Sequence, residues 1–183
     1  MSWDTELLPV PAMPYIADYY NDCENALVAL LEADGYTSTT TGDGGIQTIA
    51  ARPFSMGDVE TLFAELTADD VPAIYVHAEG KGEDEAATAE EWAMPINCLV
   101  AVVQASTSLT TLDNNTKRRL GEVERVLRQL AGGAGTAAFW NDTEVTVGPS
   151  IIMIGTEPDV AYRGVGWLQV TVRKRVLNRL EAL

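Results

Sequence analysis

The chain has 183 residues, of which 46% are hydrophobic and 21% are charged, as in globular proteins with a core of their own. Asp and Glu number 27 against 12 Lys and Arg, and the net charge of −15 argues against broad binding to nucleic-acid phosphates. No run approaches the roughly 18 apolar residues of a membrane-spanning helix, and the first residues lack a signal-peptide pattern, so we expect no membrane segment.

The charge is divided unevenly along the chain. Residues 1–116 hold 20 acids and two bases, whereas residues 117–183 hold 7 acids and 10 bases. This division favours complementary contacts between copies of the chain or with a partner. The alternative interpretation is a soluble acidic protein whose bases fall on two elements by chance.

The first half of the chain predicts an extended arm, two helices and two strands. Three prolines near its start predict the arm over residues 1–14, before a single domain over residues 15–183. Apolar residues at helical spacing predict a helix over residues 15–34. After a loop or hairpin turn, a short strand is expected over residues 46–51. A capping box at Ser55–Asp58 then predicts a second helix ending before Pro72, followed by an alternating strand over residues 73–78.

The second half predicts a central strand, a long helix and three further strands. Residues 79–91 are expected to form an acidic loop or hairpin excursion. Residues 92–105 are expected to form a central strand, and the nearly all-apolar core of this strand, residues 96–103, indicates burial on both faces. The clearest helix starts between residues 109 and 116 and carries a buried Leu and Val stripe. The side opposite this stripe is expected to carry ion pairs three and four positions apart among Arg118, Glu122, Glu124, Arg125 and Arg128. Two short strands, 145–147 and 151–154, precede a loop over 157–163 and a long alternating strand over 165–176. The fold class is therefore α+β: one mixed or antiparallel sheet packed with two to three helices.

Few residues suit catalysis or metal binding. His77 lies among apolar strand residues and is interpreted as a half-buried structural histidine. Cys23 and Cys98 are 75 positions apart in apolar patterns, which favours two buried, reduced thiols in the cytosol over a disulfide. One His and two such Cys do not make a zinc site.

The glycine-rich and acidic segments are similarly uninformative about chemistry. Gly42–Gly45 and Gly132–Gly135 lack the features of phosphate-binding loops and are interpreted as turns. The acidic run at 83–85 with 90–91 lacks the ligand spacing of a calcium loop, so a solvated loop is favoured. We therefore expect no catalytic residues, no cofactor and no metal, and expect that the protein is not an enzyme.

The densest basic cluster lies near the end of the chain. Arg173 and Arg175 share one face of the last strand, and Arg179 follows. The acidic run of Glu83, Asp84 and Glu85 is its natural complement. The sequence predicts that these six residues form a subunit or partner interface.

The order of these elements resembles the bacteriophage tail terminator, or tail completion, proteins of long-tailed phages. The resemblance covers residues 15–176. It includes a strand entered through Glu91–Ile96 and a helix with Arg119, Leu120, Val123, Val126, Leu127 and Leu130 at its apolar spacing. The proline-rich arm and the length of the acidic segment 79–91 depart from the family pattern.

The resemblance implies a small α/β sandwich that closes into a ring of six copies. Such a ring caps the tail tube, stops its polymerisation and forms the joint to the head-completion, or neck, proteins. DNA passes through without being read, and the protein is assembled in the bacterial cytoplasm and stays in the virion tail or neck. The alternatives are another head–tail connector or minor tail protein, and, in a different class, an acidic intracellular hydrolase or small-ligand binding module.

Overall fold

The computed structural model describes residues 16–38, 45–54, 71–83, 85–86, 91–131, 140, 143–155 and 162–177. Within these ranges it contains two helices and six strands. They are α1 (Ile16–Ala33), β1 (Thr48–Ala51), β2 (Ala73–Lys81), β3 (Glu85–Ala86), β4 (Glu91–Ser106), α3 (Leu109–Ala131), β5 (Thr143–Gly155) and β6 (Tyr162–Leu177).

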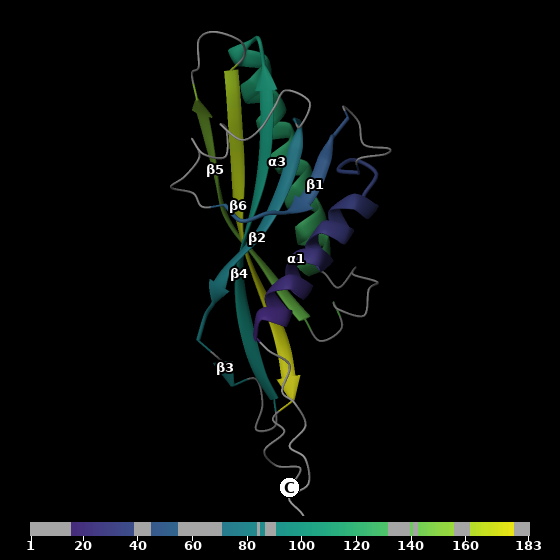
Figure 1. The fold of residues 1–183 in the computed structure, drawn as a ribbon, viewed down its shortest axis with the longest axis vertical. Helices are drawn as coiled ribbons and strands as arrows, with labels where there is room; N and C mark the ends of the chain where they lie inside the picture. The colour runs from purple at the N-terminus through teal and green to yellow at the C-terminus, as the bar shows by residue number, and fades with distance from the viewer. Residues whose placement is uncertain are drawn as a thin grey trace, which may run out of the picture.

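The strands form one mixed sheet in the order β1-β2-β4-β6-β5, and β3 pairs with β4 outside this path. The β1–β2 pair is parallel and the other pairs are antiparallel. Both helices pack on the same face of the sheet, and Figure 1 shows α3 behind the long strands β4 and β6. The predicted α+β fold class is confirmed.

The core lies on both faces of the central strand β4. Residues Cys98–Val103 are at most 1% exposed, because β2 and β6 flank β4 and both of its faces are covered. On the helix face, apolar residues of α1 and α3 pack against side chains such as Val100 and Leu168. On the opposite face a second cluster includes Tyr75 and Trp167. The prediction of a central strand buried on both faces is confirmed.

Two glycines of β6 let α3 lie close to the sheet. A Cβ atom at Gly164 would lie 3.1 Å from Thr116 Oγ1 and 3.2 Å from Leu112 Cδ1. A Cβ atom at Gly166 would lie 3.1 Å from Leu120 Cδ2. These distances are shorter than ordinary van der Waals contacts, so side chains at either position would push the helix away from the strand.

Two predictions of strand extent were wrong. The two short strands expected around Gly148–Pro149 are one strand, β5, which continues through a register shift between Val147 and Ser150. A bulge accommodates a proline, which cannot donate to the ladder, without ending the strand. Strand β6 begins at Tyr162, inside the loop predicted over 157–163.

The acidic segment 79–91 is a hairpin excursion rather than a simple loop. β2 continues to Lys81, and Glu85–Ala86 add the short strand β3 to the edge of β4. The predicted arm over 1–14, the predicted second helix and the glycines at 132–135 lie outside the described residues.

Candidate functional site: the charged end of the sheet

The structure places four of the six predicted interface residues at one end of the sheet. Glu83 is exposed just after β2, and Glu85 begins β3. Arg173 and Arg175 lie in the last part of β6. Asp84 and Arg179 lie outside the described residues. Glu85 and Arg175 are 90 positions apart in sequence. They lie at the same end of the sheet because β3 and β6 both pair with β4.

Strand register fixes how the acidic and basic residues are arranged. Glu85 pairs with Ala93 of β4, and Ala93 pairs with Arg175 on its other side. Two residues further along β4, the Pro95 carbonyl accepts a hydrogen bond from the Gly82 amide at 2.9 Å, and Pro95 pairs with Arg173 on its other side. The acids and the bases therefore lie on opposite sides of β4, two strand spacings or about 10 Å apart.

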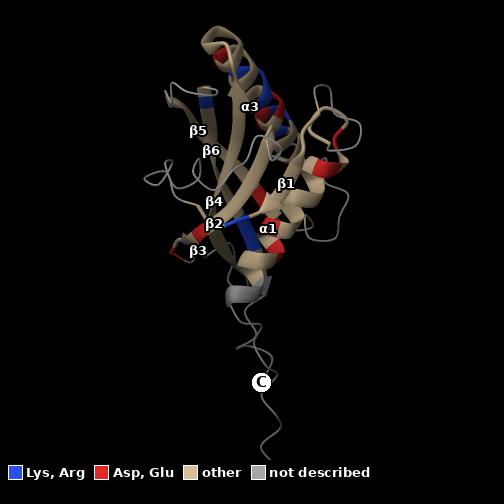
Figure 2. Ribbon diagram, turned by 45° about the horizontal axis from the view of Figure 1, so that its top comes forward, with Lys and Arg blue, Asp and Glu red and all other residues tan. Residues whose placement is uncertain are grey.

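Arg173 is directed toward β5. Its Nη1 atom donates to Thr146 Oγ1 at 2.8 Å, and Glu144 of β5 is its partner in register. β5 begins at Thr143, opposite Lys174, so the described part of β6 beyond Lys174 has a strand neighbour only on the β4 side. Beyond Lys174 the sheet is a three-stranded ribbon, β3-β4-β6, with Glu85 on β3 at one edge and Arg175 on β6 at the other, whereas Arg173 lies one strand in from the edge, beside Glu144 of β5. Figure 2 shows acidic residues near β3.

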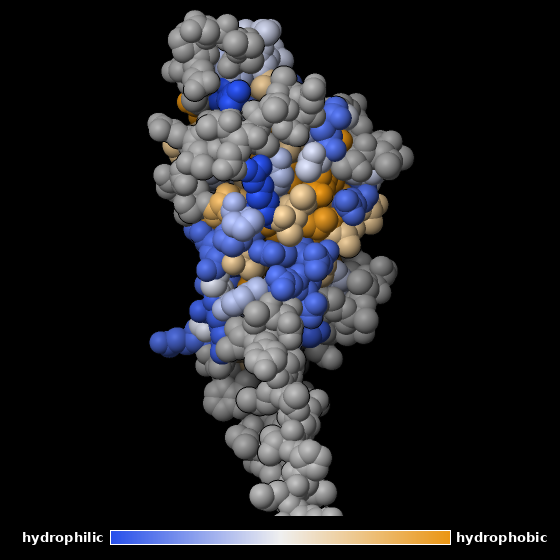
Figure 3. Space-filling view, viewed as in Figure 1, coloured by the Kyte–Doolittle hydropathy of each residue, from blue (hydrophilic) through white to orange (hydrophobic). Residues whose placement is uncertain are grey.

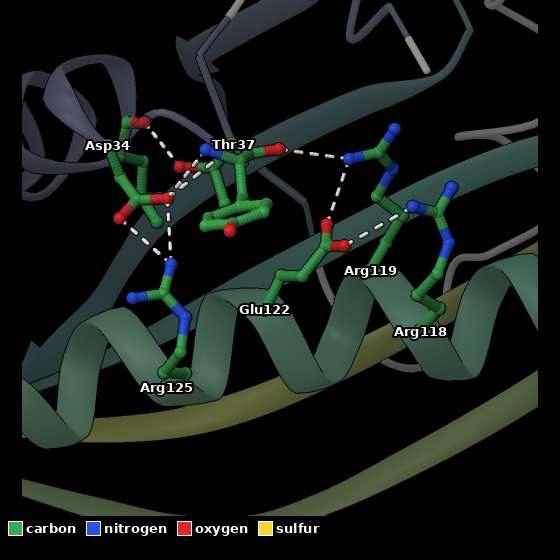
Figure 4. A network of polar contacts seen from close by, with 8 residues as sticks. Asp34, Thr37, Arg118, Arg119, Glu122 and Arg125 are labelled. Carbon is green, nitrogen blue, oxygen red and sulfur yellow. Dashed lines mark hydrogen bonds and ion pairs between the residues drawn. The ribbon is translucent and has the colours of Figure 1, made fainter. Parts of the chain in front are cut away.

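A second charged group joins the end of α1 to α3 (Figure 4). The Arg125 Nη2 atom donates to both carboxylate oxygens of Asp34 at 2.8 Å. Arg119, which is 1% exposed, donates to the Tyr36 carbonyl at 2.9 Å and to Glu122 at 2.8 Å. These contacts fix the turn after α1 against the side of α3.

The same contacts hold the pKa of the Asp34 carboxyl below its usual value. Partial burial alone would raise this pKa. Hydrogen bonds from Arg125 and from the Tyr36 and Thr37 amides, with the positive charge of Arg125, outweigh burial because they stabilise the ionised form.

Sequence reasoning found only part of this group. It placed Arg125 among exposed pairs within the helix, and two of those pairs are present, Arg118–Glu122 and Arg128–Glu124. Arg125 instead contacts Asp34, and the role of Arg119 was missed. One signal in the sequence could have indicated that Arg119 is buried. It lies three positions after Thr116 and four before Val123, which places it on the same buried face of the helix. Several bases of residues 117–128 therefore have acidic partners in their own chain, as the alternation of colours along α3 in Figure 2 illustrates.

The two cysteines are buried and free, as predicted, but they are in contact. Cys23 Sγ on α1 and Cys98 Sγ on β4 lie 3.5 Å apart. The hydrogen bond between the thiols and their burial raise the pKa of Cys23, so this thiol stays protonated. The pair belongs to the core, since both residues are at most 1% exposed.

His77 lies in β2, directly after the last residue that pairs with β1. Its side chain is partly buried, as predicted. Its Nδ1 atom lies 3.2 Å from Glu24 Oε1, and the same oxygen accepts the Ala78 amide at 2.7 Å. β1 ends its pairing at Val76, so Glu24 of α1 satisfies a backbone donor that no strand reaches.

A small groove lies between α1 and α3. It has a volume of about 150 Å³ and is lined by Leu30, Ala33, Asp34, Val126, Gln129 and Leu130. Its one carboxylate, Asp34, is already bound by Arg125, so the groove lacks the converging carboxylates expected of an acidic hydrolase. Among the described side chains, no cluster of three or more His, Cys, Asp or Glu could hold a metal ion.

Comparison with known proteins adds no relative. No family model matches the sequence, and a search of curated proteins finds no match. Neither described helix is long and apolar enough to cross a bilayer.

Proposed function

We propose that this protein is a structural assembly protein, a tail terminator of a long-tailed bacteriophage. In this role six copies close into a ring that caps the tail tube, stops its polymerisation and joins it to the head-completion, or neck, proteins. The protein works in the virion after assembly in the host cytoplasm. It needs no catalytic residue and no cofactor for this task.

The observation that carries the proposal is the placement of acidic and basic residues on opposite sides of β4 at one end of the sheet. A closed ring needs two different, complementary patches on every subunit, because each copy meets its two neighbours with different surfaces. Acidic residues beside β3 and basic residues on β6 supply such patches. Contact between the β3 edge of one copy and the β6 edge of the next would bring opposite charges together.

The net charge of −15 supports the same role. A ring through which DNA passes should not hold the phosphates, and an acidic lumen repels them. The other support for the proposal is the resemblance of the sequence itself to tail terminators over residues 15–176.

Charge reversal tests the ring interface. Arg173→Glu with Arg175→Glu should leave the protein folded and abolish rings, measured by sedimentation velocity and negative-stain electron microscopy. The matched control is Arg118→Glu with Arg128→Glu, which makes the same change in net charge on the exposed side of α3, where these side chains are 44% and 60% exposed. Rings formed equally well by both double variants would refute the assignment.

A complementary reversal makes the test specific to the pairing of the two edges. Glu83→Arg with Glu85→Arg should also abolish rings on its own. Combined with Arg173→Glu and Arg175→Glu in one chain, it should restore them, because the two edges then carry exchanged charges. Failure of the combined variant to recover, with its fold intact by circular dichroism, would show that these edges do not meet.

A further inference from the structure

The second half of β5 is an exposed, uncharged strand at the edge of the sheet. Within the described part of the chain, β5 pairs with β6 alone. Residues Ser150–Gly155 contain no charged residue, and Ile151, Met153 and Ile154 are 49%, 45% and 36% exposed. Figure 3 shows the face seen in Figure 1, on which the main described hydrophobic patch lies near β1 and β2 and the lower described surface is mostly hydrophilic.

Folded proteins usually protect such an edge. A strand with unpaired amides and carbonyls pairs with other chains unless a charge, a proline, a bulge or a covering element prevents it. The first half of β5 has these protections, with the exposed Glu144, the bulge after Val147 and Pro149. Among the described residues, the second half has none of them. This contrast within one strand marks Ser150–Gly155 as a pairing surface.

The opposite edge of the sheet does not offer a comparable strand. β1 has four residues, and beyond Val76 the carboxylate of Glu24 already accepts the Ala78 amide of β2. A second copy that approaches β5 therefore meets it best with its own β5. Such a contact is isologous, since each copy uses the same surface.

The segment is complementary to itself in an antiparallel arrangement centred on Ile152. Ile151 would lie opposite Met153 of the partner subunit, and Ile152 opposite Ile152 of the partner subunit. Directly opposed side chains on neighbouring strands are about 4.5–5.5 Å apart at Cβ, so the exposed apolar groups would cover one another on both faces.

Charge also favours this edge as the contact. At −15, copies of this chain repel each other over most of their surface. The acidic residue of β5, Glu144, lies eight positions from Ile152, about 27 Å along the strand. That distance exceeds the screening length of about 10 Å at 0.1 M salt, so pairing at Ile152 brings no acidic residue of β5 against its counterpart.

We propose that Ser150–Gly155 is a two-fold docking edge on which a second copy of this chain adds its own β5, antiparallel and in register about Ile152. The contact closes at two copies, so it is distinct from the ring interface and does not depend on the proposed function. Loss of the ring after charge reversal at Arg173 and Arg175 leaves this contact intact.

Cysteine cross-linking tests the register. Ile151→Cys and Met153→Cys are made as separate variants of different mass and mixed under glutathione disulfide. The mixture should give a disulfide-linked heterodimer, because position 151 faces position 153 of the partner subunit. Each variant alone should cross-link poorly, and the native thiols should not compete because both are buried. Equal cross-linking of each variant with itself, or none in the mixture, would overturn the proposal.

Sedimentation equilibrium tests the affinity. Met153→Lys should weaken self-association at least about tenfold, because it places a charge in the apolar centre of the contact. Gln169→Lys is the control, since Gln169 is exposed on β6, one strand in from the edge and beside Gly148 of the β5 bulge rather than beside Ser150–Gly155, and should leave association unchanged. The comparison is made in the Arg173→Glu, Arg175→Glu background, in which the proposed ring contact is absent. A chain that stays monomeric there at about 100 µM, or a dimer unaffected by Met153→Lys, would contradict the proposal.

Discussion

Replacement of Arg119 is the sharpest test of what holds α3 to the turn after α1. Arg119→Met keeps the aliphatic length of the side chain and removes its charge. It leaves the Tyr36 carbonyl and one Glu122 oxygen without their donor, bonds that measure 2.9 and 2.8 Å in the wild type. The Glu122 side chain is only 15% exposed, so water replaces the lost donor poorly.

The magnitude follows from these two bonds. Removing the charged donor of a buried acceptor lowers the free energy of unfolding by about 1.5–3 kcal/mol. Part of this loss is offset, because the variant no longer buries a charged guanidinium. We expect a loss of about 2–4 kcal/mol in the free energy of unfolding, measured by urea titration with an unchanged m-value.

Arg118 provides the matched comparison. It contacts the same Glu122 at 3.3 Å, but its side chain is 44% exposed. Exposed helix pairs contribute about 0.3–0.5 kcal/mol, so Arg118→Met should cost little. The reasoning is refuted if Arg119→Met is no more destabilising than Arg118→Met.

Two further predictions concern acid stability and helix packing. Because the pKa of Asp34 is lowered in the folded state, its ionised form adds stability above the unfolded-state pKa of about 4, and this stability is lost as pH falls through the folded-state pKa. Asp34→Asn should thus cost about 1 kcal/mol at pH 7 and progressively less on acidification; urea midpoints showing the same difference at pH 7 and pH 3 would contradict this. Gly164→Ala should destabilise by about 1–3 kcal/mol, since its Cβ would meet Leu112 and Thr116, whereas Gly121→Ala on the exposed side of α3 should stabilise by about 0.5–1 kcal/mol. Thermal melting that shifts the same way for both glycine variants would count against the packing argument.

The elements that sequence predicted best are those with a strong local period. The stripe from Leu120 to Leu130 and the apolar run in β4 determine their own structure, because burial on one or two faces leaves a repeating pattern. The extent of β5 was not predicted because Gly148–Pro149, considered without its neighbouring strand, indicates the end of a strand. Pairing with the long strand β6 carries β5 through a bulge.

The contacts that sequence could not give are those between distant segments. Arg119 and Tyr36 are 83 positions apart, and Cys23 and Cys98 are 75 positions apart. Nothing in the local pattern of either partner specifies the other, since the pairing is set by how α1, α3 and β4 meet. For the candidate interface, the sequence identified the charged residues, but only the register of β3 and β6 on β4 places them on opposite sides of that strand.

The most direct test of the proposed function is electron microscopy of the purified full-length protein together with its mass in solution. The account predicts closed rings of six copies at low salt that dissociate as salt rises, because opposite charges at the ribbon edges join neighbouring subunits. A protein that remains a monomer or only a dimer at low salt and high concentration, and forms no rings when mixed with tail tubes, would contradict it.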